Sequence, residues 1–215
     1  MITVHHLNAS RSMRVLWLLE ELGLEYRIIR YSRDPQTNLA PPEMRPVSPV
    51  GKSPTVEDGY NGGRLVFESG AIIEYLVRNY DRQNALAPKP TDPEYDDYVR
   101  WLHYAESSAM LPVMLSLYMS RLAPGADKPV RPRISGELAN HFGYISGHLE
   151  GREFLVGDGL TGADVQMAFA VEAAHKMGLV ESFPNLGEYY GRLQARPAFE
   201  RAMKRAGEEP LKPFR

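Results

Sequence analysis

The first 31 residues change twice between two periods of hydrophobicity, and this change constrains the fold more than any other feature. Residues 2–7 alternate apolar and polar side chains as a β-strand does, whereas the apolar side chains of residues 13–24 recur at the spacing of an α-helix. Gly23 stands where a helix terminator is expected, and residues 26–31 again have the pattern of a strand. A strand, a short helix and a second strand predict a βαβ unit with a parallel pair of strands.

The next fifty residues complete a small α/β domain. Residues 34–54 are polar and rich in proline, which favours a long loop with at most one short irregular helix. The runs 55–57 and 64–67 flank a turn-rich connection and predict a β-hairpin. Ser69 can cap a following helix, whose apolar stripe includes Ile72 and Leu76.

A composition change then divides the chain. Residues 82–93 are polar, contain three prolines and have no apolar period, so they predict a linker. Residues 94–215 have only helical patterns, with Pro112 expected to kink the first long helix. We therefore expect an α/β domain over residues 1–81 and an all-helical domain over residues 94–215.

Charge and hydropathy argue against a nucleic-acid partner, a membrane span and secretion. With 25 basic and 27 acidic residues the formal net charge is −2, which does not favour nucleic acid. The longest apolar run, Val15–Leu19, is far shorter than the roughly 20 residues of a membrane span. The start has no basic region before an apolar stretch, so we expect no secretory signal and a cytoplasmic protein.

The chain has no cysteine and six histidines. The absence of cysteine excludes disulfides, thiolate metal sites and a protein thiol nucleophile, so any reacting thiol must belong to a ligand. The histidines show no metal-ligand spacing, and we expect no metal site.

Polar residues stand at three breaks in the α/β domain. Ser10 and Ser12 precede the first helix, where unpaired N–H groups favour an anion, although a serine there can simply cap the helix. Lys52 and Ser53 precede a proline at the entry of a strand; alone, the lysine reads as a surface charge and the proline bond as trans. Glu68 and Ser69 lie at the start of the next helix, where such a pair could hold the ammonium and the carboxylate of one ligand. Alone, the pair reads as a capping serine beside a glutamate that suits the helix dipole.

Together these positions resemble the cytosolic glutathione S-transferase family, of the serine type. The resemblance rests on Ser10 followed by Arg14-Val15-Leu16, on residues 49–54 (Pro-Val-Gly-Lys-Ser-Pro) and on residues 68–72 (Glu-Ser-Gly-Ala-Ile). Residues 159–164 (Gly-Leu-Thr-Gly-Ala-Asp) are similar to the start of a helix in the second domain, where Thr161 and Asp164 form a structural capping box. The resemblance implies a thioredoxin-like domain followed by an all-α domain.

The resemblance also implies the roles of site residues. Ser10 would stabilise the thiolate of glutathione, whereas Ser12 would cap the helix. Lys52 would meet the glycyl carboxylate, and the backbone of Ser53 before a cis Pro54 would bind the peptide. An aliphatic residue is commoner than Ser53 at that position, but backbone atoms make those contacts.

Glu68 and Ser69 would bind the γ-glutamyl end of glutathione. The electrophile would bind between the domains, with Tyr104, Met110 and Leu111 as candidate lining residues, although such positions are also typical of core or dimer contacts. The implied activity is conjugation of glutathione to small hydrophobic electrophiles by a homodimer. The alternatives are a glutathione-dependent peroxidase or isomerase, and a glutathione-binding carrier with little turnover.

Overall fold

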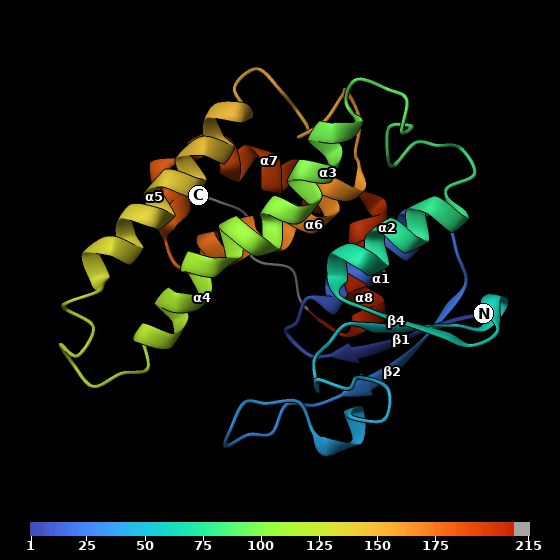
Figure 1. Ribbon diagram of the computed structural model, residues 1–215, viewed down its shortest axis with the longest axis horizontal. Coiled ribbons are helices and arrows are strands. Elements are labelled where there is room, and N and C mark those ends of the chain that lie inside the picture. The colour runs from blue at the N-terminus through green and yellow to red at the C-terminus, as the bar shows by residue number, and fades with distance from the viewer. Residues whose placement is uncertain (209–215) are drawn as a thin grey trace. The chain divides into compact units, whose positions relative to one another are not determined.

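The computed structural model describes residues 1–208 (Figure 1). The chain divides into two compact units. Unit 1 comprises residues 1–84 together with the described residues from 193 onward, and unit 2 comprises residues 85–192. No helix among residues 1–208 is long and apolar enough to cross a membrane.

Unit 1 is built on a four-stranded mixed sheet with the order β2-β1-β3-β4. Its strands are β1 (Ile2–Leu7), β2 (Tyr26–Tyr31), β3 (Thr55–Asp58) and β4 (Arg64–Phe67). β1 pairs with β2 in parallel, and the β1–β3 and β3–β4 pairs are antiparallel. Two short 3₁₀ turns, Pro42–Met44 and Gly59–Asn61, lie in the connections. The predicted βαβ unit and the predicted hairpin are confirmed, and the unit has the thioredoxin-like arrangement.

Helices α1 (Ser12–Glu21), α2 (Ser69–Tyr80) and α8 (Pro197–Ala206) accompany this sheet (Figure 1). The apolar stripe of α1 is fully buried from Val15 to Leu19, together with Ile2 and Val4 of β1. Ile72 and Ile73 of α2 complete this core. Burial of these side chains holds β1, and therefore the turn that follows it, in a fixed position against α1.

Helix α8 belongs to unit 1, although its place in the sequence predicts that it lies within the helical domain of residues 94–215. Its Phe199 ring lies edge-on to Trp17 of α1, with 5.3 Å between ring centroids. Arg196 donates to Glu21 at 2.6 Å, and Arg201 donates to Glu20 at 2.8 Å. The grouping follows from these contacts, since the acidic end of α1 meets a basic face of α8.

Charge pairing between α1 and α8 predicts a pH-dependent stability. Burial acts to raise the pKa of Glu20, but hydrogen bonds from Arg201, Tyr26 and Arg205 outweigh burial and lower that pKa. A lowered folded-state pKa stabilises the fold above the unfolded carboxyl pKa of about 4.3, and this stabilisation is lost as the pH falls through the folded-state pKa.

We therefore expect Glu20→Gln to reduce the free energy of unfolding by about 1 kcal/mol at neutral pH. Urea unfolding across pH measures this, and the difference between wild type and variant should disappear in acid. Glu25→Gln, at an exposed position nearby, is the control. A difference that stays the same from neutral to acid pH would assign the effect to packing instead of charge.

The regular elements of unit 2 are all helices in its described residues, as predicted. Its elements are α3 (Tyr95–Tyr104), a π-helical turn (Ala105–Ala109), α4 (Met110–Met119), α5 (Arg131–His148), α6 (Gly162–Lys176), a 3₁₀ turn (Leu179–Ser182) and α7 (Pro184–Gln194). The interruption between α3 and α4 lies just before Pro112 in the sequence. Proline lacks the N–H that would bond the carbonyl of Ser108 and its ring crowds that carbonyl, so the preceding turn widens.

The start of α6 organises the core of unit 2. Asp164 is fully buried and accepts hydrogen bonds from the backbone of Leu155 at 2.9 Å and of Thr161 at 2.8 Å. It also accepts from the Thr161 hydroxyl at 2.9 Å and the Tyr189 hydroxyl at 3.0 Å. The predicted capping box is confirmed, and its carboxylate additionally ties the loop before α6 to α7.

Candidate active site

The turn between β1 and α1 gathers three serine hydroxyls. Ser10 is 6% exposed, and its Oγ accepts a hydrogen bond from the backbone N–H of Ser12 at 3.3 Å. The Oγ atoms of Ser10 and Ser12 are 2.8 Å apart, and Ser10 Oγ donates to Ser53 Oγ at 3.3 Å. The turn places Ala9 at a positive φ of 49°. This backbone brings the Ser10 hydroxyl to the N-terminal end of α1, where the helix dipole is positive.

The prediction that Ser12 caps α1 is wrong. The residue before the helix is Arg11, and no side chain makes a capping hydrogen bond there. Ser12 is instead the first helical residue, is completely buried, and its Oγ lies 2.8 Å from Nδ1 of His6. The side chain turns inward because the helix begins with Ser12 already on the face that covers β1.

The loop before β3 is fixed beside Ser10. The Ser53–Pro54 peptide bond is cis, as the family resemblance predicted. Ser53 Oγ donates to the carbonyl of His5 at 3.1 Å and accepts from the N–H of Leu7 at 3.3 Å, so the side chain extends the β1–β3 pairing by one step. Lys52 is exposed on the same loop, whose backbone bonds to the Ser48 hydroxyl through both the N–H and the carbonyl of Lys52.

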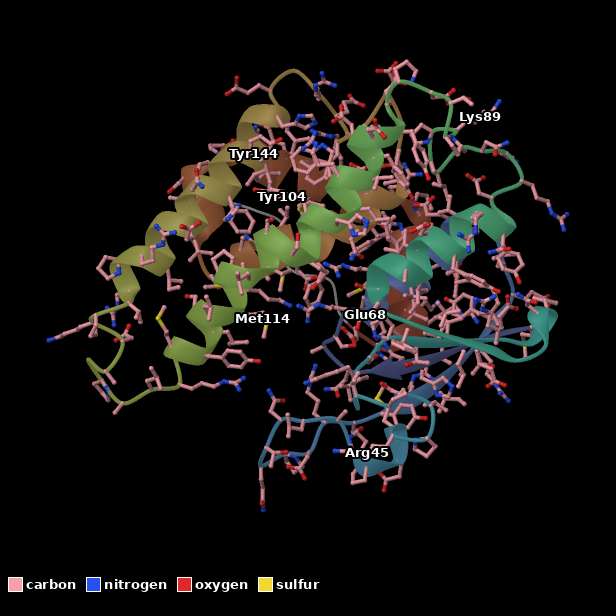
Figure 2. The ribbon with its side chains drawn as sticks, viewed as in Figure 1. Arg45, Glu68, Lys89, Tyr104, Met114 and Tyr144 are labelled. Carbon is pink, nitrogen blue, oxygen red and sulfur yellow. The ribbon has the colours of Figure 1, made fainter. Side chains whose placement is uncertain are left out.

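The N-terminus of α2 carries the third predicted pair. Glu68 precedes the helix with φ at +70°, a region that side chains rarely adopt, and its side chain is exposed (Figure 2). Ser69 is the first helical residue and is 4% exposed, so the prediction that it caps α2 is wrong. Its Oγ accepts from Nη1 of Arg14, a buried α1 residue, at 3.1 Å. A buried cation therefore lies behind the helix end that was predicted to bind the γ-glutamyl end of glutathione.

The residues predicted to line an electrophile pocket lie in unit 2. Tyr104 is partly buried at the end of α3, Met110 is buried, and Leu111 is 58% exposed. The Tyr104 hydroxyl lies 2.6 Å from Nδ1 of His141, and its ring is 5.5 Å from that of Tyr144 (Figure 2). Burial raises the pKa of Tyr104 to about 12, so this phenol stays protonated at neutral pH. The role of Tyr104, Met110 and Leu111 in binding an electrophile stays a prediction.

Comparison with known proteins places this architecture in a family. Residues 1–78 match the glutathione S-transferase N-terminal domain, and residues 107–197 match the glutathione S-transferase C-terminal domain. Glutathione S-transferase 1 of Saccharomyces cerevisiae is 30% identical over 224 residues, which cover 95% of each chain. The chain belongs to the glutathione S-transferase family.

Further relatives agree with this transferase assignment. Glutathione S-transferase 3 of Schizosaccharomyces pombe is 32% identical over 100% of this chain and 91% of its own. A solved glutathione S-transferase from Actinobacillus pleuropneumoniae is 31% identical, with a TM-score of 0.87 over 97% of this chain and 94% of that one. A glutathione transferase from Phanerochaete chrysosporium, solved with oxidized glutathione, is 28% identical with a TM-score of 0.82 over 96% of both chains. The protein is therefore an enzyme of the glutathione transferase type.

Three polar residues of this transferase were not singled out from the sequence. The motif around Ser10 includes Arg14 without assigning it a role, His6 is one of the histidines without metal-ligand spacing, and no predicted motif includes Glu208. Glu208 lies 3.2 Å from Nε2 of His6 and accepts from the N–H of Ala9 at 2.9 Å. An arginine within the apolar stripe of α1 is a signal that could have been used, because a buried charge requires a partner.

Proposed function

We propose that this transferase joins the thiolate of glutathione to small hydrophobic electrophiles, with Ser10 as the thiolate-stabilising hydroxyl. The observation that carries the proposal is the position of Ser10 Oγ, at the N-terminus of α1 and 3.3 Å from Ser53 beside the cis proline. With no cysteine in the chain, the reacting sulfur belongs to the bound peptide.

The chemical demand on Ser10 is modest. A free thiol has a pKa of about 8.5, and each unit of lowering corresponds to roughly 1.4 kcal/mol in favour of the thiolate. Because Ser10 Oγ accepts the N–H of Ser12, its own O–H can be donated to the sulfur. One hydrogen bond to an anion, together with the positive end of α1, is of the size required.

The ends of the peptide have matching partners. Lys52 is an exposed cation for the glycyl carboxylate, on a loop whose backbone Ser48 holds in place. At the other end, the α-carboxylate of the γ-glutamyl residue would meet Ser69 at the N-terminus of α2, with the buried Arg14 guanidinium behind it. The ammonium group of the same γ-glutamyl residue would meet the carboxylate of Glu68.

Glu68→Gln should weaken glutathione binding by about 1.5 to 3 kcal/mol, because a charged hydrogen bond to the peptide ammonium is lost. Calorimetric titration measures the dissociation constant. Glu74→Gln, an exposed glutamate on α2, is the matched control and should bind as the wild type does. A dissociation constant for Glu68→Gln within the error of the wild type would remove Glu68 from the site.

The activity is tested with glutathione and a panel that contains an activated aryl halide, an α,β-unsaturated carbonyl compound and an organic hydroperoxide. Mass spectrometry of the products should show a thioether conjugate with the first two compounds. Oxidized glutathione formed from the hydroperoxide without any thioether would favour the peroxidase alternative. Saturable binding of glutathione without any product would favour a carrier.

We also propose a homodimer in which unit 1 of each protomer meets unit 2 of the other. On the edge strand β4, Leu65 and Phe67 are 44% and 45% exposed on the same side of the strand. Along α4 and just beyond it, Leu115, Tyr118 and Leu122 recur at helical spacing and are 39%, 56% and 52% exposed. Exposed apolar side chains grouped in this way are typical of an interface, and twofold pairing is the common form for homo-oligomers.

Sedimentation equilibrium at micromolar concentration should give the mass of a dimer, which is twice 24.2 kDa. Leu65→Glu should raise the dimer dissociation constant by about tenfold or more, since it places a charge in an apolar contact. Leu39→Glu, at a 57% exposed loop position outside the proposed interface, should leave the mass unchanged. A wild-type protein that sediments as a monomer would contradict the proposal.

A further inference from the structure

A continuous chain of polar groups runs inward from Ser10. Its first link is the 2.8 Å contact between the hydroxyls of Ser10 and Ser12. The second is the 2.8 Å contact between Ser12 Oγ and Nδ1 of His6, and the third is the 3.2 Å contact between Nε2 of His6 and Glu208. Ser10, Ser12 and His6 are 6%, 0% and 2% exposed, so the links between them are shielded from water.

The far end of this chain is fixed. Glu208 Oε1 accepts the N–H of Ala9 at 2.9 Å, and Ala9 directly precedes Ser10. The carboxylate is therefore tied to the same turn whose hydroxyl faces the proposed thiolate. A carboxylate facing Nε2 of an imidazole keeps a proton on that nitrogen and stabilises the imidazolium that forms when the other nitrogen is protonated.

We propose that His6, supported by Glu208, accepts the thiol proton of bound glutathione through the hydroxyls of Ser10 and Ser12. This inference rests on the proposed function, because it requires glutathione sulfur at Ser10. His6 and Glu208 act through the two serines and do not touch the peptide, so they are positioning and proton-holding residues.

The proton transfer balances along the chain. Before transfer, His6 is neutral with its proton on Nε2, Ser12 O–H donates to Nδ1, and Ser10 O–H donates to Ser12. The thiol proton then passes to Ser10 Oγ, the former Ser10 proton passes to Ser12 Oγ, and the former Ser12 proton passes to Nδ1. The products are a thiolate and an imidazolium paired with Glu208, and no proton reaches solvent.

The transfer also leaves Ser10 correctly oriented. Once Nδ1 donates to Ser12, the Ser12 hydroxyl can donate to Ser10 at 2.8 Å, which is closer than its other acceptor, the Leu7 carbonyl at 3.5 Å. The Ser10 O–H is then left to donate to the thiolate. The competing donation from Ser10 to Ser53 spans 3.3 Å, longer than the 2.8 Å link to Ser12. Protonation of His6 therefore sets the direction of both hydroxyls toward the sulfur.

This inference is tested by counting the protons released when the full chain binds glutathione with no electrophile present. At about pH 7.5, below the ordinary thiol pKa of about 8.5, binding is followed by thiolate absorbance and by calorimetry in buffers of different ionisation enthalpy. Retention on His6 predicts clearly less than one proton released per thiolate formed. Release of about one proton per thiolate would overturn the inference.

Three variants locate the proton. His6→Asn keeps an amide N–H to donate to Ser12 but cannot hold a proton, so about one proton should be released for each thiolate still formed. Ser12→Ala should do the same, and kcat should fall by about tenfold or more while the KM for glutathione changes little. Glu208→Gln keeps acceptors for Ala9 and removes the charge, and should give an intermediate proton count. Variants whose proton count and thiolate yield both equal those of the wild type would overturn the inference.

Two controls separate this inference from the proposed function. Glu200→Gln, at an exposed site on α8, should match the wild type in proton count and kcat. Thermal unfolding of each variant checks that the fold is retained. If Ser10→Ala leaves thiolate formation unchanged, the proposed role of Ser10 fails. If Ser10→Ala abolishes the thiolate but the wild type releases one proton for each thiolate, only the relay to His6 fails.

Discussion

Ser10→Ala should lower kcat for conjugation by about 100-fold, while the dissociation constant for glutathione changes by less than about twofold. The lost hydrogen bond stabilises charge on the sulfur and does not touch the carboxylates that hold the peptide, so its effect falls on turnover. Steady-state kinetics with an activated aryl halide, combined with calorimetric binding, separates the two quantities. Ser32→Ala, an exposed serine just after β2, is the control.

The opposite pattern would contradict the role proposed for Ser10. A weakened glutathione affinity with unchanged kcat would mean that Ser10 holds the peptide and not the thiolate. Conservative restoration with Ser10→Thr should recover part of kcat, because a hydroxyl is again present at the end of α1. A threonine variant as slow as the alanine variant would instead indicate a steric cause.

The largest effect on stability is expected from Asp164→Ala, which should reduce the free energy of unfolding by about 3 to 5 kcal/mol. The substitution leaves buried donors from Leu155, Thr161 and Tyr189 without their shared acceptor, and each unsatisfied buried donor costs about 1 to 3 kcal/mol. Burial raises the pKa of Asp164 even though these hydrogen bonds act to lower it.

Urea unfolding followed by circular dichroism measures this loss. Asp158→Ala, at an exposed position in the preceding loop, should change stability by less than about 0.5 kcal/mol. Asp164→Asn retains one acceptor oxygen and should lie between alanine and wild type. An Asp164→Ala variant as stable as the wild type would show that the carboxylate does not hold the start of α6.

The sequence was informative where a local period or motif decides the structure. The alternation in residues 2–7, the helical stripe from Val15 and the turn-rich hairpin each predicted an element that the structure contains. The helix caps at Ser12 and Ser69 were predicted wrongly. Both serines are first helical residues with inward-turned side chains, and the exact residue at which a helix begins depends on packing against the sheet.

The grouping of α8 with unit 1 was not predictable in the same way. Arg196 and Glu21 form their ion pair across 175 residues of sequence, and no local pattern encodes a contact at that separation. Polar residues with long-range partners were missed for the same reason. His6 pairs with Glu208 from the far end of the chain, and Arg14 meets Ser69 across 55 residues.

The most direct test of the proposed chemistry is a spectroscopic thiolate titration of glutathione bound to the wild type and to Ser10→Ala. In the wild type, the bound thiol should have a pKa at least about one unit below the ordinary value of about 8.5. In Ser10→Ala, the pKa of the bound thiol should lie within about half a unit of the ordinary value. Titration curves that coincide in the two proteins would contradict the assignment of Ser10 as the thiolate-stabilising hydroxyl.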